Sequence, residues 1–127
     1  MRNFIADIIF WLHAVVLLFW WGLFFVPTGM WASKISFHFF FTVGIVGHQF
    51  LWGAMTMPWT KKYQMTCILT TIMQWVRGEK LSDERNYRHV WTKEFFRRAG
   101  WGLPERGATI VTAIISTIVT IQYSFFR

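Results

Sequence analysis

The order of apolar and polar residues along the chain predicts three membrane-spanning helices. Two long apolar segments, residues 4–26 and 35–57, follow one another and are separated by a short turn that contains Pro27 and Gly29. Each is long enough to cross a bilayer, which takes about 20 residues of α-helix. A third apolar segment covers residues 105–126. The first two segments are therefore expected to form a helical hairpin, and the third to cross the membrane after a long connection.

The connection between the second and third spans contains two shorter predicted helices. The apolar stretch at residues 63–77 is too short to span comfortably at about 1.5 Å per residue, so it is expected to be interfacial or re-entrant. Residues 83–99 follow as an amphipathic helix, with Ser82 as its N-cap and Gly100 after its last turn. The predicted fold class is an all-α integral membrane helical bundle that forms a single domain over residues 1–127.

The predicted helix at residues 83–99 has one apolar face and one basic face. A basic amphipathic helix with aromatic residues on its apolar side is typical of a membrane surface. The same pattern also suits packing against another protein, and both interpretations stay open. The residues expected at the membrane surface are Arg85, Arg88, Trp91, Lys93, Phe95 and Arg97.

Composition and charge support a membrane protein and suggest its orientation. Hydrophobic residues make up 54% of the chain and charged residues only 15%, against about 25% charged residues in a typical soluble domain. The net charge of +7 is explained by the positive-inside bias with fewer assumptions than by nucleic-acid binding. With three spans, every basic residue except Lys34 and Arg127 falls on one side. We therefore expect a bacterial inner-membrane protein with its N-terminus and residues 61–106 in the cytoplasm.

Two histidines inside the predicted spans are candidate cofactor ligands. His13 and His48 each lie about nine residues from the cytoplasmic end of their helix, which is roughly 13 Å into the membrane. Ionisable residues in hydrocarbon raise a functional question. One interpretation is a bis-histidine haem b site or a shared metal, and the other is two histidines that are hydrogen-bonded to neighbouring helices. The sequence contains no CxxCH, HExxH or Gly-rich phosphate motif, and its single cysteine, Cys67, excludes an internal disulfide.

Small and polar residues form stripes on two of the predicted spans. In lipid, hydrophobic burial does not drive helices together, so association depends on close packing and hydrogen bonds. The stripes are therefore expected to pack against other helices, and the one on the second span also suits a ligand or quinone pocket. Their positions are Thr109, Thr112, Ser116 and Thr120 on the third span, and His38, Thr42, Gln49 and Thr56 on the second. Gly44 and Gly47 lie elsewhere on the second span and are expected to permit close approach of another helix.

The segment Cys67-Ile-Leu-Thr-Thr-Ile-Met-Gln-Trp-Val-Arg77 resembles the C-P-L-T-x-x-E-x-x-L-R signature of a bacterial family of small membrane proteins of unknown function. Ala6-Asp7 followed by His13 resembles that family's opening A-D-x-x-x-x-x-H, and His89 lies where members carry an F-I-x-H stretch. The family's proline and glutamate are replaced here by Ile68 and Met73. The resemblance covers most of the chain and implies the fold. The family has no established activity, so it implies no mechanism.

The sequence predicts an accessory subunit of a larger membrane complex, such as a respiratory or photosynthetic electron-transport complex. Nine tryptophans, the small-residue stripes and the amphipathic connector all suit lateral packing. The expected partners are other integral membrane proteins and the lipid bilayer, and not nucleic acid. One alternative is a haem b protein that uses His13 and His48. A second is a small membrane enzyme or transporter component, although Asp7 is the only acidic residue inside a span and no catalytic set is visible.

Overall fold

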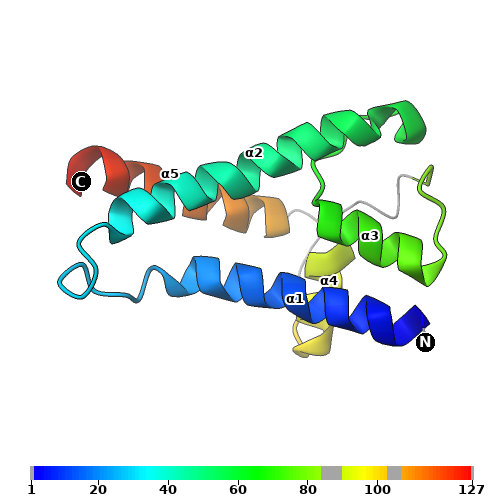
Figure 1. Ribbon diagram of the computed structural model, residues 1–127, viewed down its shortest axis with the longest axis horizontal. Helices are drawn as coiled ribbons and strands as arrows, with labels where there is room; N and C mark the ends of the chain where they lie inside the picture. Colours follow the sequence, from blue (N-terminus) through cyan, green and yellow to red (C-terminus); the bar gives the residue numbers. More distant parts are fainter. Residues whose placement is uncertain (1, 84–89, 103–106, 127) are drawn as a thin grey trace.

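The computed structural model describes residues 2–83, 90–102 and 107–126, which form five α-helices and no strand (Figure 1). Three helices are long and apolar enough to cross a membrane. The predicted all-α fold with three candidate spans is thus confirmed for this part of the chain. In chain order the helices are α1 (Arg2–Gly22), α2 (Lys34–Thr60), α3 (Ile68–Arg77), α4 (Val90–Arg98) and α5 (Gly107–Phe126).

Several helix ends differ from the sequence prediction. Helix α1 ends at Gly22 and not at residue 26, and α3 begins at Ile68 and not at residue 63. Helix α2 continues beyond its predicted end at residue 57 and includes Pro58, because a proline in the last turn removes only one helical hydrogen bond. It ends instead at a left-handed C-cap, where Lys61 has a φ of 59° and its N–H donates to the Met57 carbonyl oxygen. Helix α4 is described from Val90, so the predicted N-cap Ser82 lies before it in a turn. Residues 84–89, which include Arg85 and Arg88, lie outside the described residues.

The directions of the helices are those expected for three crossings. The N-terminus and the C-terminal ends of α2 and α3 lie at one end of the molecule (Figure 1). The turn between α1 and α2 lies at the opposite end, together with the C-terminus. Helices α1, α2 and α5 therefore run up, down and up again. The ten-residue helix α3 is about 15 Å long and does not span a bilayer.

After α2 the chain folds back along the same helix. The backbone of Gln64 lies against Gly53, and the N–H of Ile68 donates to the Nε2 of His48 at 3.2 Å. From Thr60 back to His48 the return covers about 18 Å of the α2 axis. Helix α3 then runs out again toward the end of the molecule where α2 ended (Figure 1). The helix of this stretch therefore begins only after the chain has returned along α2.

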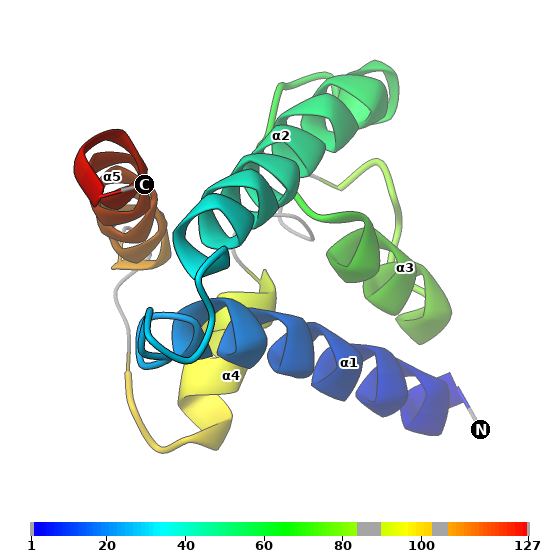
Figure 2. The same ribbon diagram turned by 60° about the vertical axis from the view of Figure 1, so that its left-hand side comes forward.

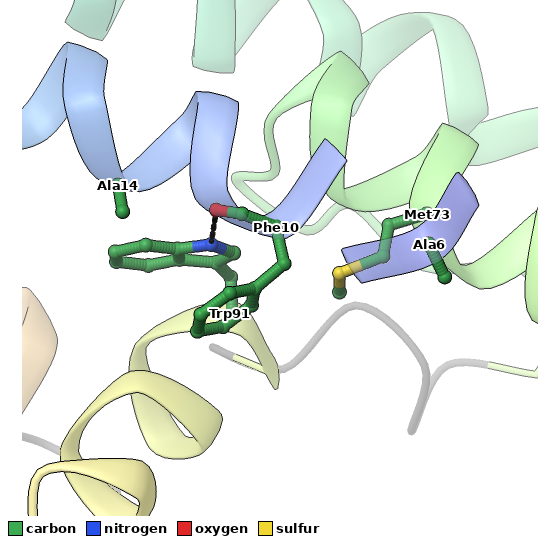
Figure 3. Packing of buried hydrophobic residues seen from close by; sticks show 5 residues of the cluster. All are labelled: Ala6, Phe10, Ala14, Met73 and Trp91. Atoms are coloured by element: carbon green, nitrogen blue, oxygen red, sulfur yellow. Dashed lines mark hydrogen bonds between the residues drawn. The ribbon is translucent and has the colours of Figure 1, made fainter. Parts of the chain in front are cut away.

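The hydrophobic core lies where α3 and α4 meet the N-terminal half of α1 (Figure 3). Ala6, Phe10 and Ala14 recur every fourth residue on one face of α1, and the two alanines leave room for the neighbouring helices. Met73 of α3 and Trp91 of α4 complete the cluster. The Trp91 indole N–H donates to the Phe10 carbonyl oxygen at 3.0 Å, and the two rings stack with centroids 5.4 Å apart. The core thus attaches the connector to the first span.

Helices α1 and α2 diverge from their connecting turn, and α3 lies between them (Figure 2). Near the turn they are joined by a hydrogen bond of 2.8 Å from the Trp20 Nε1–H to the Thr42 hydroxyl oxygen. Helix α5 packs mainly against α2, and the Tyr123 and Phe39 rings stack there at 4.1 Å.

Candidate site: two adjoining cavities between the spans

A small cavity with polar groups in its wall, the polar cavity, lies between α1, α2, α4, α5 and the segment that leads into α3. Its volume is about 90 Å³. A second, largely apolar cavity of about 330 Å³ lies between α1, α2 and the start of α3. We call it the apolar cavity. The two adjoin each other, since His13, Leu17, Gln49 and Cys67 line both.

His13 stands in the wall between the two cavities. It is only 7% exposed, and its ring centroid lies 4.5 Å from that of Trp91. Its Nδ1 atom is buried and has no hydrogen-bond partner among the described residues. Helix α1 places it here because His13 lies three residues after Phe10, on the face that meets α4.

His48 lines the apolar cavity from the α2 side. The structure thus brings the two predicted cofactor ligands, His13 and His48, to the wall of one cavity. Their roles differ, because the Nε2 of His48 already accepts the hydrogen bond from the Ile68 N–H. That lone pair is available to a metal only if the N-terminus of α3 gives up this bond. In the part of the chain that the structure describes, no three His, Cys, Asp or Glu side chains are grouped to hold a metal ion.

Two further side chains in the wall of the polar cavity carry buried polar atoms without a described partner. They are the indole Nε1 of Trp21 and the hydroxyl oxygen of Thr66, which itself is only 4% exposed. Buried polar groups are nearly always hydrogen-bonded, and an unsatisfied one costs about 1–3 kcal/mol. The sequence analysis did not single out either residue, since nothing in the pattern places a turn of α1 beside the segment before α3.

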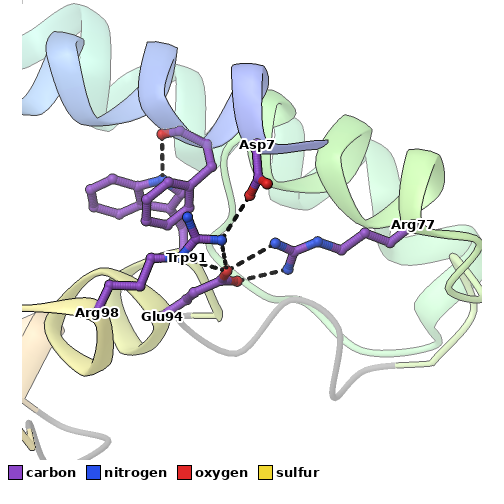
Figure 4. A network of polar contacts seen from close by, with 6 residues as sticks. Asp7, Arg77, Trp91, Glu94 and Arg98 are labelled. Carbon is purple, nitrogen blue, oxygen red and sulfur yellow. Dashed lines mark hydrogen bonds and ion pairs between the residues drawn. The ribbon is translucent and has the colours of Figure 1, made fainter. Parts of the chain in front are cut away.

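A network of charged side chains holds α1, α3 and α4 together beside the core (Figure 4). Both guanidinium N–H groups of Arg77 reach the Glu94 carboxylate, at 2.7 and 3.0 Å. Arg98 donates to the same carboxylate at 2.7 Å and to Asp7 on α1 at 2.8 Å. The hydrogen bond from Arg77, helped by that from Arg98, lowers the pKa of Glu94. The spacing of Glu94 and Arg98 was the only sequence signal for this network.

Helix α4 corrects one sequence expectation. Trp91 was expected at the membrane surface, but it is 4% exposed and packs in the core against α1. Phe95 is half-buried with its ring 5.0 Å from that of Trp91. Lys93 is also half-buried, and Arg97 is exposed. The aromatic face of α4 therefore meets the chain's own first helix, because the divergence of α1 and α2 leaves α1 uncovered there.

The predicted stripe on α5 is divided between two environments. Thr112 and Ser116 are half-buried, whereas Thr109 and Thr120 are largely exposed. Thr109 and Thr112 also line the polar cavity. The Thr120 hydroxyl donates to the Ser116 carbonyl oxygen at 2.8 Å. Such a bond one turn back satisfies the hydroxyl inside its own helix. Thr120 therefore needs no second polypeptide as a hydrogen-bond partner.

The predicted polar arc on α2 mostly faces the interior. His38 and Thr42 are buried next to α1, where the Phe24 ring lies 4.7 Å from the His38 ring. Gln49 lines both cavities. Thr56 is buried, and its hydroxyl donates to the Gly53 carbonyl oxygen at 3.1 Å.

No described segment of this chain approaches the two glycines that were predicted to allow close approach. A Cβ atom added at Gly44 or Gly47 would meet nothing within 4 Å. At Gly53, by contrast, another segment does approach closely, and an added Cβ would clash with the Gln64 carbonyl oxygen. The sequence shows which positions lack a side chain, but not which of them a neighbour will use.

No protein-family model, curated protein or solved structure matches this chain. The resemblance of residues 67–77 to a bacterial membrane family stays a prediction.

Proposed function

We propose that this chain is a small integral membrane subunit that packs against another membrane polypeptide through α2. The observation that carries the proposal is an open groove on the outside of α2, the glycine groove, with a volume of about 490 Å³. Its floor contains Gly44 and Gly47, and its rim contains Val43, Leu51 and Met55, all of them largely exposed. No described segment of the chain fills it.

A groove of this kind suits a helix from another protein. In lipid, apolar side chains gain nothing by leaving the hydrocarbon, so association depends on close contact between helix surfaces. Two glycines three residues apart on one face let a second backbone approach closely enough for that contact. The expected partner is therefore an apolar membrane helix that places a ridge of side chains over Gly44 and Gly47. A respiratory or photosynthetic electron-transport complex is the kind of assembly in which we place it.

The orientation is part of the same proposal. We place the N-terminus and residues 61–106 in the cytoplasm of a bacterial cell, since that side then carries every basic residue except Lys34 and Arg127. The arrangement of the helices supports this, because α1 begins and α2 ends at the same end of the molecule (Figure 1).

The test fills the groove without disturbing the chain itself. Gly47→Leu adds bulk where a Cβ meets nothing within 4 Å, so the variant is expected to fold with unchanged helical content. After mild detergent extraction from native membranes, it should lose a polypeptide that co-purifies with the wild type. Ala54→Leu is the matched control, since it adds similar bulk at an exposed position of α2 outside the groove. Equal retention of the same polypeptides by both variants would refute packing through this groove.

One observation favours a second candidate function, the binding of haem b. His13 and His48 both line the apolar cavity, as a bis-histidine site requires. Against it, the Nε2 of His48 is engaged by Ile68. If haem is bound, the protein purified from haem-supplied cells shows a stoichiometric Soret band that His13→Ala and His48→Ala each abolish. A wild-type spectrum without that band rejects this candidate.

A further inference from the structure

We propose that the polar and apolar cavities together bind one neutral, membrane-soluble molecule whose carbonyl head occupies the polar cavity and whose apolar body occupies the apolar one. This goes beyond the proposed packing function. The glycine groove adjoins the apolar cavity at Gly44 and His48, but none of its lining residues lines the polar cavity, which holds the head of the ligand. The class includes isoprenoid quinones and neutral acyl esters such as diacylglycerol, which share a carbonyl acceptor on an apolar body.

The unpartnered groups in the wall specify an acceptor. The indole nitrogen of Trp21 can only donate a hydrogen bond, and it is buried without a partner among the described residues. The Thr66 hydroxyl and the His13 Nδ1 atom, buried and unpartnered in the same wall, can each donate or accept, so the indole of Trp21 is the group that requires an acceptor. A carbonyl oxygen placed among them would satisfy one or more of these donors. A head that carries only donors would leave Trp21 unsatisfied.

Size and charge restrict the head further. The polar cavity holds about 90 Å³, room for a ring edge or an ester group but not for a sugar or a phosphorylated glycerol. Among the residues that the structure describes, its lining contains no Lys, Arg, Asp or Glu side chain, so a phosphate would be buried there without a counter-charge from them. Burying an uncompensated ion is costly. These two facts favour a neutral head over the head of an anionic phospholipid.

The apolar cavity supplies room for the body of the ligand and a path from the membrane. It adjoins the polar cavity at His13 and Gln49, and its walls include Val16, Phe41 and Ile45. Phe40, which also lines it, is 62% exposed, so the cavity reaches the surface between the two candidate spans. Water could occupy the polar cavity, which has space for about three molecules, but it would not be favoured in the apolar one. A single molecule with a polar head and an apolar body suits both the polar and the apolar cavity.

The proposal is tested on the full-length protein in lipid nanodiscs that contain either decyl-ubiquinone or dioleoylglycerol, with native mass spectrometry to count bound molecules. We expect a one-to-one adduct with at least one of the two probes. The probe that binds identifies the source, a quinone or a neutral ester. Trp21→Phe, which keeps an aromatic ring but removes the donor, should weaken retention about ten-fold, the equivalent of one hydrogen bond.

Two controls keep the outcome decisive. Trp11→Phe removes an indole from an exposed position on the same helix and should leave retention unchanged. Thr66→Val, nearly isosteric, should weaken retention even if Trp21→Phe fails to fold. Absence of a one-to-one adduct with both probes would overturn the proposal. So would a preference for phosphatidylglycerol, or equal retention by the wild type, Trp21→Phe and Thr66→Val. Gly47→Leu should bind the probe normally, which separates this site from the packing proposal.

Discussion

The Nε2 atom of His48 accepts a hydrogen bond from the backbone N–H of Ile68, at 3.2 Å. Ile68 is the first residue of α3, and the side chain of the preceding Cys67 makes no capping hydrogen bond. The first N–H groups of a helix have no acceptor inside that helix, so they need one from elsewhere. A histidine that the sequence presents as a cofactor ligand thus caps the N-terminus of α3 from the neighbouring helix α2.

Replacing His48 by phenylalanine should loosen α3. The ring volume is retained, but the N–H of Ile68 loses its acceptor, which we expect to cost about 1 kcal/mol of stability. Hydrogen exchange in nanodiscs should become faster over the first turns of α3. His48→Gln keeps an acceptor, so its exchange rate over these turns should be intermediate between those of His48→Phe and the wild type. Unchanged exchange in His48→Phe would mean that this hydrogen bond does not hold the helix.

The return of the chain along α2 makes a second prediction, about accessibility. Lys62 precedes the return along α2, and Ser82 follows α3. Because α2 and α3 end at the same end of the molecule (Figure 1), we expect Lys62→Cys and Ser82→Cys, made in a Cys67→Ala background, to react with an impermeant thiol reagent from the same side of the membrane. Thr28→Cys, in the turn between α1 and α2, should react only from the other side. Reaction of Lys62→Cys and Ser82→Cys from opposite sides would require a fourth crossing.

The helices themselves could be predicted because each is encoded locally. Long apolar runs determine the three spans, and the apolar run before Arg77 is short, which indicates a helix that does not cross the membrane. The path between them could not be predicted, because a pattern shows which face of a helix is apolar but not what covers it. Trp91 illustrates this: the stripe to which it belongs is clear in the sequence, yet its neighbour, Phe10, is 81 residues away along the chain.

For the candidate site too, local features could be predicted from the sequence and spatial neighbours could not. His13 and His48 were found because a histidine in an apolar segment stands out in any sequence. Trp21 and Thr66 were missed, since a tryptophan and a threonine are ordinary residues at the end of a span and in a loop. Their significance depends on burial without a partner, which arises only when α1 and the segment before α3 are brought together.

The charged network predicts a specific response to substitution and to pH. Glu94→Gln removes the carboxylate that accepts from Arg77 and Arg98, and should cost about 1–3 kcal/mol, the range for hydrogen bonds to charged groups. Because the pKa of Glu94 is lowered in the folded protein, its carboxylate stabilises the fold above the ordinary glutamate pKa of about 4.3. That contribution should decline as the pH falls below this value, and disappear below the lowered pKa.

Unfolding in mixed micelles between pH 3 and pH 7 measures both effects. Glu94→Gln should flatten the acidic part of the stability curve. Glu79→Gln is a matched control, because Glu79 is exposed and lies outside the network of Asp7, Arg77, Glu94 and Arg98; this variant should keep the wild-type curve. If Glu94→Gln and the wild type lose stability in parallel on acidification, Glu94 is not the group responsible.

Trp91 should contribute more to stability than any exposed tryptophan. Trp91→Phe keeps a ring against Phe10 but loses the donor to its carbonyl oxygen, and should cost about 1 kcal/mol. Trp91→Ala also opens a cavity in the core and should cost about 3–5 kcal/mol. Trp101, which is 68% exposed, is the comparison: Trp101→Ala should change stability by no more than about 0.5 kcal/mol. A similar loss for both alanine variants would contradict the packing of α4 on α1.

The two kinds of glycine on α2 should respond in opposite ways to the same substitution. At Gly53 an added Cβ would clash with the Gln64 carbonyl oxygen, a backbone atom that can move only if the returning segment moves with it. Gly53→Ala should therefore destabilise the protein by about 1–3 kcal/mol, as overpacking does. At Gly47 the same methyl group meets nothing within 4 Å, and alanine is the better helix former by about 1 kcal/mol. Gly47→Ala should be neutral or stabilising in the isolated chain.

Unfolding measurements on this pair test the return of the chain along α2 without touching any polar group. Both variants add one methyl group to the same helix, so differences in lipid contact and helix propensity largely cancel. If the segment before α3 did not lie against α2, the two substitutions would have the same effect, and both would stabilise. The expected difference in sign arises only because Gln64 occupies the space beside Gly53.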